Sequence, residues 1–278
     1  MQRREFIKGA AAAALAAPLF HSACDKDPRV LLDSDVIPLL VQQHDQIIPE
    51  LLTRQEEYSS HRWFGGVKDK WGIHTPNGTA QFIRTLTCAL LSPESKFFQS
   101  SEMEQRIYNA TTYLRNAQHD DGTIDLLSTN FHSTPDTAFV MEWMCGSYGL
   151  LKNAQNEEFG ELLELVRGFL LPAGDALSIG GIHTPNHRWV VCMALARLNS
   201  LFPNENYIKR IDEWLAENID IDEDGQYTEK SSSIYSPLTD RCLITVARLL
   251  NRSELYKPVR KNLDMTLYYI HPNGEVVT

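Results

Sequence analysis

Apolar residues recur at helical spacing downstream of four prolines: Pro76, Pro135, Pro185 and Pro237. Each of these runs is apolar on most faces, which indicates a buried helix. Between the runs lie segments that are apolar along one face only: 102–117, 155–170, 205–218 and 253–269. Buried and half-exposed helices that alternate in this way predict an all-α fold. The expected architecture is an (α/α) solenoid or toroid with inner and outer helices.

A short motif repeats ahead of the buried runs. Residues 72–77 and residues 181–186 share the sequence GIHTPN, and weaker copies lie at 133–136 and 235–238. The four prolines are 59, 50 and 52 residues apart, which is the spacing of a repeat architecture. A threonine or serine precedes each proline, an order that favours an N-cap followed by the first helical residue. We therefore expect four N-caps: Thr75, Thr134, Thr184 and Ser236.

The first 23 residues read as an export signal. Paired Arg3 and Arg4, followed by Phe6 and a short apolar run, are typical of a twin-arginine signal. Small residues ahead of Cys24 fit a lipoprotein cleavage box, whereas His21 does not, so a lipid anchor at Cys24 stays an open alternative. We expect an exported protein that is periplasmic or anchored to a membrane as a lipoprotein.

Residues 24–270 are expected to form the toroid, and the region before the first motif is its least regular part. Residues 24–60 predict one or two helices, interrupted at Pro38 and Pro49. Four cysteines fall inside the apolar helices, which favours buried free thiols over disulfides: Cys88, Cys145, Cys192 and Cys242. Their spacing indicates no zinc site, and the sequence implies no metal or other cofactor.

The net charge of the chain limits the classes of molecule that it is expected to bind. The formal net charge is −10, and removal of residues 1–23 takes away a net +2 and leaves −12. Such a surface disfavours nucleic acid and anionic membranes. The overall charge also gives no sign of an anionic substrate, although a cleft can differ locally from the total. No feature of the sequence predicts an oligomeric state.

Polar residues concentrate in the loops ahead of the inner helices. In a toroid such loops emerge at one end and converge on a central cleft, where function concentrates. The sequence therefore predicts that His74, His132, His187 and Tyr235 face a common space. The N-terminal ends of the inner helices would supply partial positive charge for an anionic group.

The fourth of these loops carries a resemblance to a known family. Asn186 and His187, followed by Asp224, Gly225, Glu229, Ser231 and Tyr235, resemble the motifs of heparinase II/III-like and alginate lyase-like polysaccharide lyases. The loop reads D-G-x-x-x-E-x-S-x-x-x-Y, one residue longer before Tyr235 than in the family. The resemblance covers roughly residues 70–270. It implies an incomplete (α/α) toroid without the C-terminal β-sandwich of relatives, so that residues 271–278 would begin a missing or truncated β segment.

The resemblance implies β-elimination at a uronic acid within an anionic oligo- or polysaccharide. Asn186 would neutralise the uronate carboxylate, while His187 and Tyr235 would share the roles of base and acid. A cation beside Tyr235 would be needed to lower its pKa for the role of base. The remaining substrate-binding candidates are Arg188, His132, Glu229, Trp71, Trp63 and Arg241.

Several of these residues also have a structural interpretation. Asn186 could only cap or follow a helix start, and Tyr235 could be a core aromatic. Glu229 is expected to orient its loop by accepting backbone N–H bonds. Trp63 and Trp71 lie in a loop, so they are better sugar-stacking candidates than the tryptophans at helical spacing.

Two other functions stay open. A glycoside hydrolase on the same fold would use a pair of carboxylates, which the loops could supply from Asp121, Asp125, Asp136, Asp224 and Glu229. A non-catalytic, surface glycan-binding lipoprotein would need the scaffold alone. The ultraviolet absorbance of an unsaturated product distinguishes the lyase from both.

Overall fold

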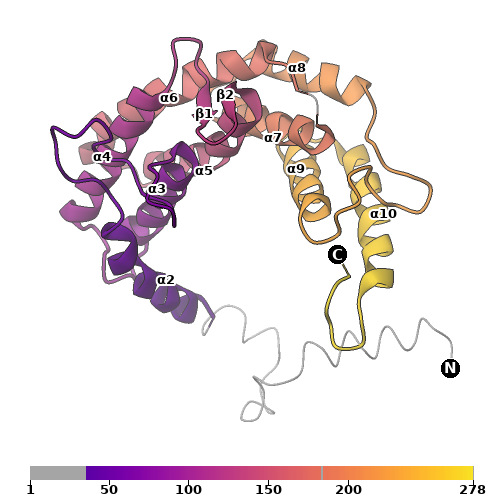
Figure 1. Cartoon of the computed structure of the whole chain (residues 1–278), viewed down its shortest axis with the longest axis horizontal. Coiled ribbons are helices and arrows are strands. Elements are labelled where there is room, and N and C mark those ends of the chain that lie inside the picture. Colours follow the sequence, from indigo (N-terminus) through magenta and orange to yellow (C-terminus); the bar gives the residue numbers. More distant parts are fainter. Residues whose placement is uncertain (1–35, 183, 278) are drawn as a thin grey trace.

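Two concentric rows of helices form the molecule. The computed structural model describes residues 36–182 and 184–277, and within these residues the inner row consists of α3 (Pro76–Leu91), α5 (Thr134–Asn153), α7 (Pro185–Leu201) and α9 (Tyr235–Leu250). The outer row consists of α4 (Ser101–Ala117), α6 (Gly160–Ile179), α8 (Glu205–Ala216) and α10 (Tyr256–Thr266). Figure 1 shows both rows following one open arc from α2 (Val36–Leu52) to α10. The predicted all-α incomplete toroid is confirmed.

The inner helices are buried because neighbours cover them on several sides. α7 packs against α5, α6, α8 and α9, and eleven of its 17 residues are buried, Trp189 among them. The core extends from α3 to α9 without a break. Cys145, Cys192 and Cys242 are buried in it and Cys88 is half-buried, all four as free thiols. The prediction of free thiols within apolar helices is confirmed for these four residues.

The predicted caps hold for two of the four inner helices. Thr75 and Thr184 occupy the N-cap positions of α3 and α7, with a proline as the first helical residue. The cap of α5 is Ser133, whose hydroxyl accepts the N–H of Asp136, so the assignment to Thr134 was wrong by one residue. The assignment to Ser236 was also wrong, because α9 begins at Tyr235 without a side-chain cap.

Three further boundaries differ from the sequence predictions. α2 runs as one helix through Pro49, although a proline inside a helix removes one backbone bond. Pro38 lies in its first turn, where a proline is tolerated. α6 extends about nine residues beyond the predicted end, because the helix continues through Pro172. Short 3₁₀ turns precede α6 and α10 and follow α10: Glu157–Phe159, Ser253–Leu255 and Leu267–Tyr269.

A small antiparallel hairpin precedes α5. Its strands are β1 (Ile124–Leu126) and β2 (Asn130–Ser133), and β2 leads directly into the helix. The hairpin was not predicted. Near the C-terminal end, an isolated bridge joins Ile270 to Val276. The described part of the region 271–278 thus forms a turn closed by this bridge. The interpretation of the region as the start of a β segment stays a prediction.

One device recurs in three of the loops that precede inner helices. Gly65, Gly122 and Gly225 all have positive φ, and each lies directly against the backbone of an outer helix. A Cβ atom at these glycines would lie 1.9–2.4 Å from the carbonyl oxygens of Asn109 in α4, Pro172 in α6 and Lys261 in α10. Side-chain amides hold the same glycine carbonyls, donated by Gln55, Gln118 and Asn262 respectively. The loops are therefore pinned to the outer row at equivalent places.

Residues 1–35 lie outside the described part of the chain, and with them the predicted export signal and the anchor at Cys24. Within the described part, no helix combines the length and the apolar character that crossing a bilayer requires.

Candidate functional site

Neighbouring inner helices are linked to one another near their N-terminal ends. The loop before α9 reaches the start of α7, where Glu229 accepts hydrogen bonds from Asn186. The start of α5 also touches the start of α7, since the ring of Phe139 meets His187 edge-on with centroids 5.9 Å apart. α3 contacts β1, which lies just ahead of α5. These contacts link the starts of neighbouring inner helices in pairs. That His74, His132, His187 and Tyr235 face one common space stays a prediction.

Asn186 and Glu229 form the link between two of these loops. The Asn186 backbone N–H donates to Glu229 Oε2 at 3.0 Å, and its side-chain amide donates to Oε1. The Thr184 side chain makes no capping bond, so Glu229 supplies the acceptor that the helix start needs. A carboxylate here is also favoured by the helix dipole. This matches the loop-orienting role expected of Glu229.

Asn186 is placed beneath the surface. The residue is 1% exposed, and its Oδ1 is buried without a hydrogen-bond partner. Direct contact between Asn186 and a substrate carboxylate, as predicted, is not available in this arrangement, because the residue is enclosed and its amide already donates to Glu229. Asn186 instead holds the fourth loop against α7.

His187 is half-buried on the next position of α7. Burial lowers the pKa of its imidazole from 6.5, while the charges of Asp136 and Glu229 act in the opposite direction. The imidazole is therefore neutral at pH 7 and has a free lone pair for a proton. Asp136 lies in the first turn of α5, where its carboxylate accepts a hydrogen bond from the Ser133 hydroxyl and its backbone N–H donates to the same oxygen.

Tyr235 is the first residue of α9, the helix beside α7, and is 41% exposed. Its backbone N–H donates to Ser231 Oγ at 3.4 Å. The interpretation of Tyr235 as a buried core aromatic is therefore wrong. His187 and Tyr235 lie near the N-terminal ends of adjacent inner helices. We name Asp136, Asn186, His187, Glu229 and Tyr235 the helix-start cluster.

The two arginines predicted to bind substrate are engaged elsewhere. Arg188 is 8% exposed, and its guanidinium pairs with Glu217 at 2.8 Å and with Asp220. It ties α7 to the end of α8 and cannot reach a ligand without breaking both pairs, so its assignment to substrate binding is corrected. Arg241 of α9 pairs at 3.2 Å with Glu142 of α5.

His132 belongs to a second polar group on the hairpin. Its Nδ1 lies 2.7 Å from Asp121 Oδ2, and its ring stacks on His119 with centroids 3.8 Å apart. His119 in turn bonds Asp125 at 2.7 Å. Hydrogen bonds from Thr123 are the main cause that lowers the pKa of Asp121 to about 2. His119 was missed from the sequence because its pairing depends on the unpredicted hairpin.

The aromatic candidates of the first loop have different surroundings. Trp71 is 75% exposed, with the Lys70 ammonium 5.0 Å from its ring centroid. Trp63 is half-buried between His74 and Tyr113 and therefore serves packing. His74 is 8% exposed and contacts Glu56, which agrees with the scaffold role expected of it. Its copy, His183, lies outside the described residues.

Within residues 36–182 and 184–277, no group of three His, Cys, Asp or Glu side chains is arranged to hold a metal ion. What the helix-start cluster offers is acid–base chemistry: a neutral imidazole, an exposed phenol and two carboxylates. The fold and this cluster define an (α/α) toroid protein with polar chemistry at the open ends of its inner helices.

Comparison with solved structures gives the same fold. The chain is similar to a GH76 α-mannanase of Bacteroides thetaiotaomicron, with a TM-score of 0.51 and 14% identity over 86% of this chain and 73% of that one. A polysaccharide lyase aligns with a TM-score of 0.39 and 10% identity, over 85% of this chain and 47% of that one. No family model and no curated protein matches the sequence.

Proposed function

We propose that this protein is a polysaccharide lyase that cleaves a uronic-acid-containing glycan by β-elimination. The observation that carries the proposal is that a neutral, half-buried His187 and an exposed Tyr235 lie at the starts of two adjacent inner helices, α7 and α9. The lyase-like run from Asp224 to Tyr235 supports it. The likeness in fold to a carbohydrate-active enzyme is compatible with any glycan chemistry on this scaffold.

The reaction needs a base on one side of the uronate and an acid at its leaving oxygen. In the proposed step His187 takes the proton from C5, and the C–H electron pair becomes the double bond between C4 and C5. The bond from C4 to O4 breaks, and the Tyr235 phenol gives its proton to O4. The products are an unsaturated uronate and a shortened chain, after which solvent restores both side chains.

The C5 proton becomes acidic only when the uronate carboxylate is neutralised. Because the Asn186 amide is held by Glu229, the proposal assigns this task to the positive N-terminal ends of α5, α7 and α9. The Asp136 carboxylate accepts a hydrogen bond from Ser133 and the Glu229 carboxylate accepts two from Asn186, each at a helix start, which disperses their own charge. Asn186 then acts as a positioning residue for the neighbouring His187.

The test measures near-ultraviolet absorbance while the protein is incubated with a panel of uronate-containing glycans. His187→Ala should lower the rate about 10²–10⁴-fold, the usual contribution of a general base, and Tyr235→Phe should do likewise. Tyr256→Phe is a matched control, because Tyr256 is the first residue of α10 and is 43% exposed. The rate should fall as pH drops below the lowered pKa of His187. Undiminished rates in both active-site variants would reject the assignment.

A glycoside hydrolase is the second candidate, favoured by one observation. Asp136 and Glu229 both lie close enough to His187 for their charges to act on its titration, and paired carboxylates are what glycan hydrolysis needs. New reducing ends without ultraviolet absorbance would identify this reaction. Binding without either product would instead indicate a glycan-binding surface lipoprotein. In every case we propose that the protein acts outside the cytoplasm, following its signal-like N-terminus.

A further inference from the structure

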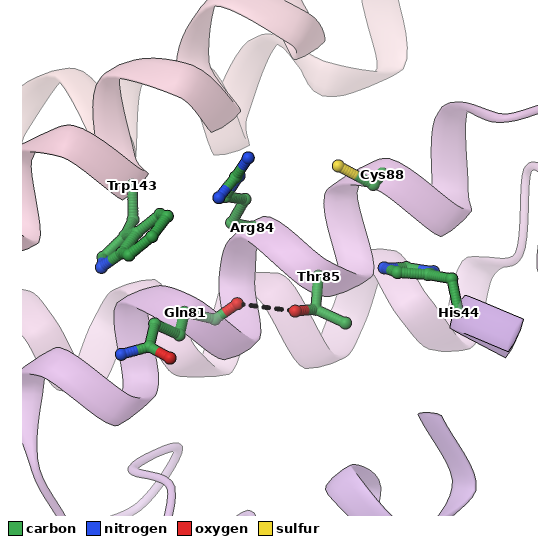
Figure 2. Close-up of a pocket in the computed structure, with 6 residues that line it drawn as sticks. All are labelled: His44, Gln81, Arg84, Thr85, Cys88 and Trp143. Atoms are coloured by element: carbon green, nitrogen blue, oxygen red, sulfur yellow. Dashed lines mark hydrogen bonds between the residues drawn. The ribbon is translucent and has the colours of Figure 1, made fainter. Parts of the chain in front are cut away.

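A pocket lies apart from the helix-start cluster, on the inner row near α2. It has a volume of about 320 Å³ and is lined by side chains from α2, α3 and α5: His44, Gln81, Arg84, Thr85, Cys88 and Trp143. Figure 2 shows Arg84 beside Trp143, with His44 at the other end of the group. Trp143 is seven residues beyond Asp136 on α5, which is roughly 10 Å along the helix axis at the usual rise. The pocket is thus about two turns from the proposed reaction centre.

The chemistry of this pocket differs from that of the molecule as a whole. The chain carries a formal net charge of −10, yet neither aspartate nor glutamate lines the pocket. The Arg84 guanidinium lies 4.7 Å from the Trp143 ring centroid. Within the described residues Arg84 makes no ion pair with a carboxylate, in contrast to Arg188 and Arg241. A fixed cation without its own counter-ion attracts an anion from solution.

The second feature is an aromatic surface beside this cation. Trp143 is half-buried, and its indole forms part of the pocket wall. The apolar C–H face of a pyranose ring gains free energy by leaving water against such a ring. Gln81 and Thr85 add an amide and a hydroxyl along the same face of α3. The Thr85 hydroxyl donates to the Gln81 carbonyl and the Gln81 amide donates to Asn77, which leaves their oxygens as acceptors. A guanidinium, an indole and neutral hydrogen-bonding groups together suit a ring-shaped ligand that bears a carboxylate.

We propose that this pocket is a binding subsite for an acidic sugar unit of the glycan, remote from the bond that is cleaved. Arg84 binds the sugar carboxylate and Trp143 packs against the sugar ring. The inference rests on the proposed function for the identity of the ligand as a glycan, but it requires no cleavage. It also accounts for how a chain with a strongly negative net charge binds an anionic substrate, through one acid-free patch.

Binding is tested by tryptophan fluorescence with tetrasaccharides of polygalacturonate, polyglucuronate and polymannuronate. The protein carries His187→Ala, so that a bound probe is not consumed. We expect at least one acidic probe to bind, and Arg84→Gln to weaken it about tenfold, the size of one partly exposed charge-assisted contact. Arg167→Gln is the matched control, because Arg167 is also exposed and lies 5.9 Å from the ring centroid of Phe202, on the outer row.

The carboxyl-reduced form of the same tetrasaccharide separates charge from shape. It should bind the parent protein about tenfold more weakly than the acid does, and Arg84→Gln should not weaken it further. Trp143→Phe should remove most of the fluorescence change while leaving the protein folded. Equal binding of the acidic and reduced probes, an unchanged Kd in Arg84→Gln, or no binding of any probe would overturn the proposal.

Cys88 gives an independent readout of occupancy. It is half-buried in the pocket, whereas Cys145, Cys192 and Cys242 are buried. Alkylation at Cys88, followed by peptide mass spectrometry, should slow when the acidic probe is bound; unprotected alkylation at saturating probe contradicts the location. The lyase proposal fails in a different experiment, if the protein with His187 intact releases no unsaturated product. Arg84-dependent binding without product would leave the subsite in place.

Discussion

Replacement of Glu229 tests whether the fourth loop is held to α7 as described. Glu229→Ala removes the acceptor of two hydrogen bonds, from the backbone N–H and the side-chain amide of Asn186. A hydrogen bond to a charged group contributes about 1.5–3 kcal/mol. Asn186 is 1% exposed, so its N–H groups would lose this acceptor in an enclosed position. Because Glu229 is itself half-exposed, we take about 1.5 kcal/mol for each of the two bonds. We therefore expect Glu229→Ala to lower the free energy of unfolding by about 3 kcal/mol.

This loss should be measurable as a shift in thermal unfolding. At roughly 2–4 °C per kcal/mol for a chain of this size, Glu229→Ala should lower Tm by about 6–12 °C. Glu229→Gln keeps one acceptor oxygen and should lose about half as much. The control is Glu223→Ala, an exposed glutamate of the same loop, which should change stability by less than about 0.5 kcal/mol. If Glu229→Ala and Glu223→Ala have the same Tm, the link between the loop and α7 does not exist in solution.

The same substitution changes the titration of His187 in a direction that the structure determines. The charge of Glu229 raises the pKa of His187 and partly offsets the effect of burial. Glu229→Gln removes that charge, so the pKa should move further below 6.5. The acid limb of the pH–rate profile and the imidazole NMR titration should then both shift to lower pH. An unchanged pKa of His187 would show that the two side chains are not neighbours.

Two further predictions concern the scaffold. Gly72→Ala adds a Cβ at φ +78° with nothing within 4 Å, and it should lower the free energy of unfolding by roughly 1 kcal/mol. Gly65→Ala adds a Cβ at φ +84° only 1.9 Å from the Asn109 carbonyl oxygen, and it should lower the free energy of unfolding by roughly 3 kcal/mol or more, measured by urea denaturation. Equal losses in the two variants would refute the close contact. Burial raises the pKa of Asp240 to about 6 against the hydrogen bond from Tyr227. Stability should therefore decline by at most about 3 kcal/mol as pH rises from about 4 through 6, and Asp240→Asn should abolish this dependence.

Much of the helical architecture could be predicted because its signals are local. A proline preceded by threonine favours a helix start wherever it occurs, and apolar spacing marks a buried face within a few turns. These signals located α3, α5, α7 and α9 and the alternation with outer helices. The expected convergence of the loops followed from the repeat, since equivalent units stack in equivalent orientations.

The partners of individual side chains could not be predicted in this way. Glu229 and Asn186 are 43 residues apart, and Arg188 and Asp220 are 32 apart. Three of these four residues, Asn186, Glu229 and Arg188, looked like ligand-binding groups in the sequence. A carboxylate or guanidinium has the same sequence signal whether it faces a ligand or another buried charge. Only the packing of α7 against its neighbours decides which of them remains exposed.

The amino-acid sequence by itself determined that this chain forms stacked pairs of helices with polar loops at one end, because helix starts and buried faces are encoded within a few turns. Tertiary structure alone decided that His187 and Tyr235 stay accessible while Asn186 and Arg188 are enclosed. It also decided that Arg84 and Trp143, which the sequence did not mark as a pair, share one pocket. The physical reason is that accessibility and charge pairing depend on which helices lie side by side, and that is a property of the assembled arc.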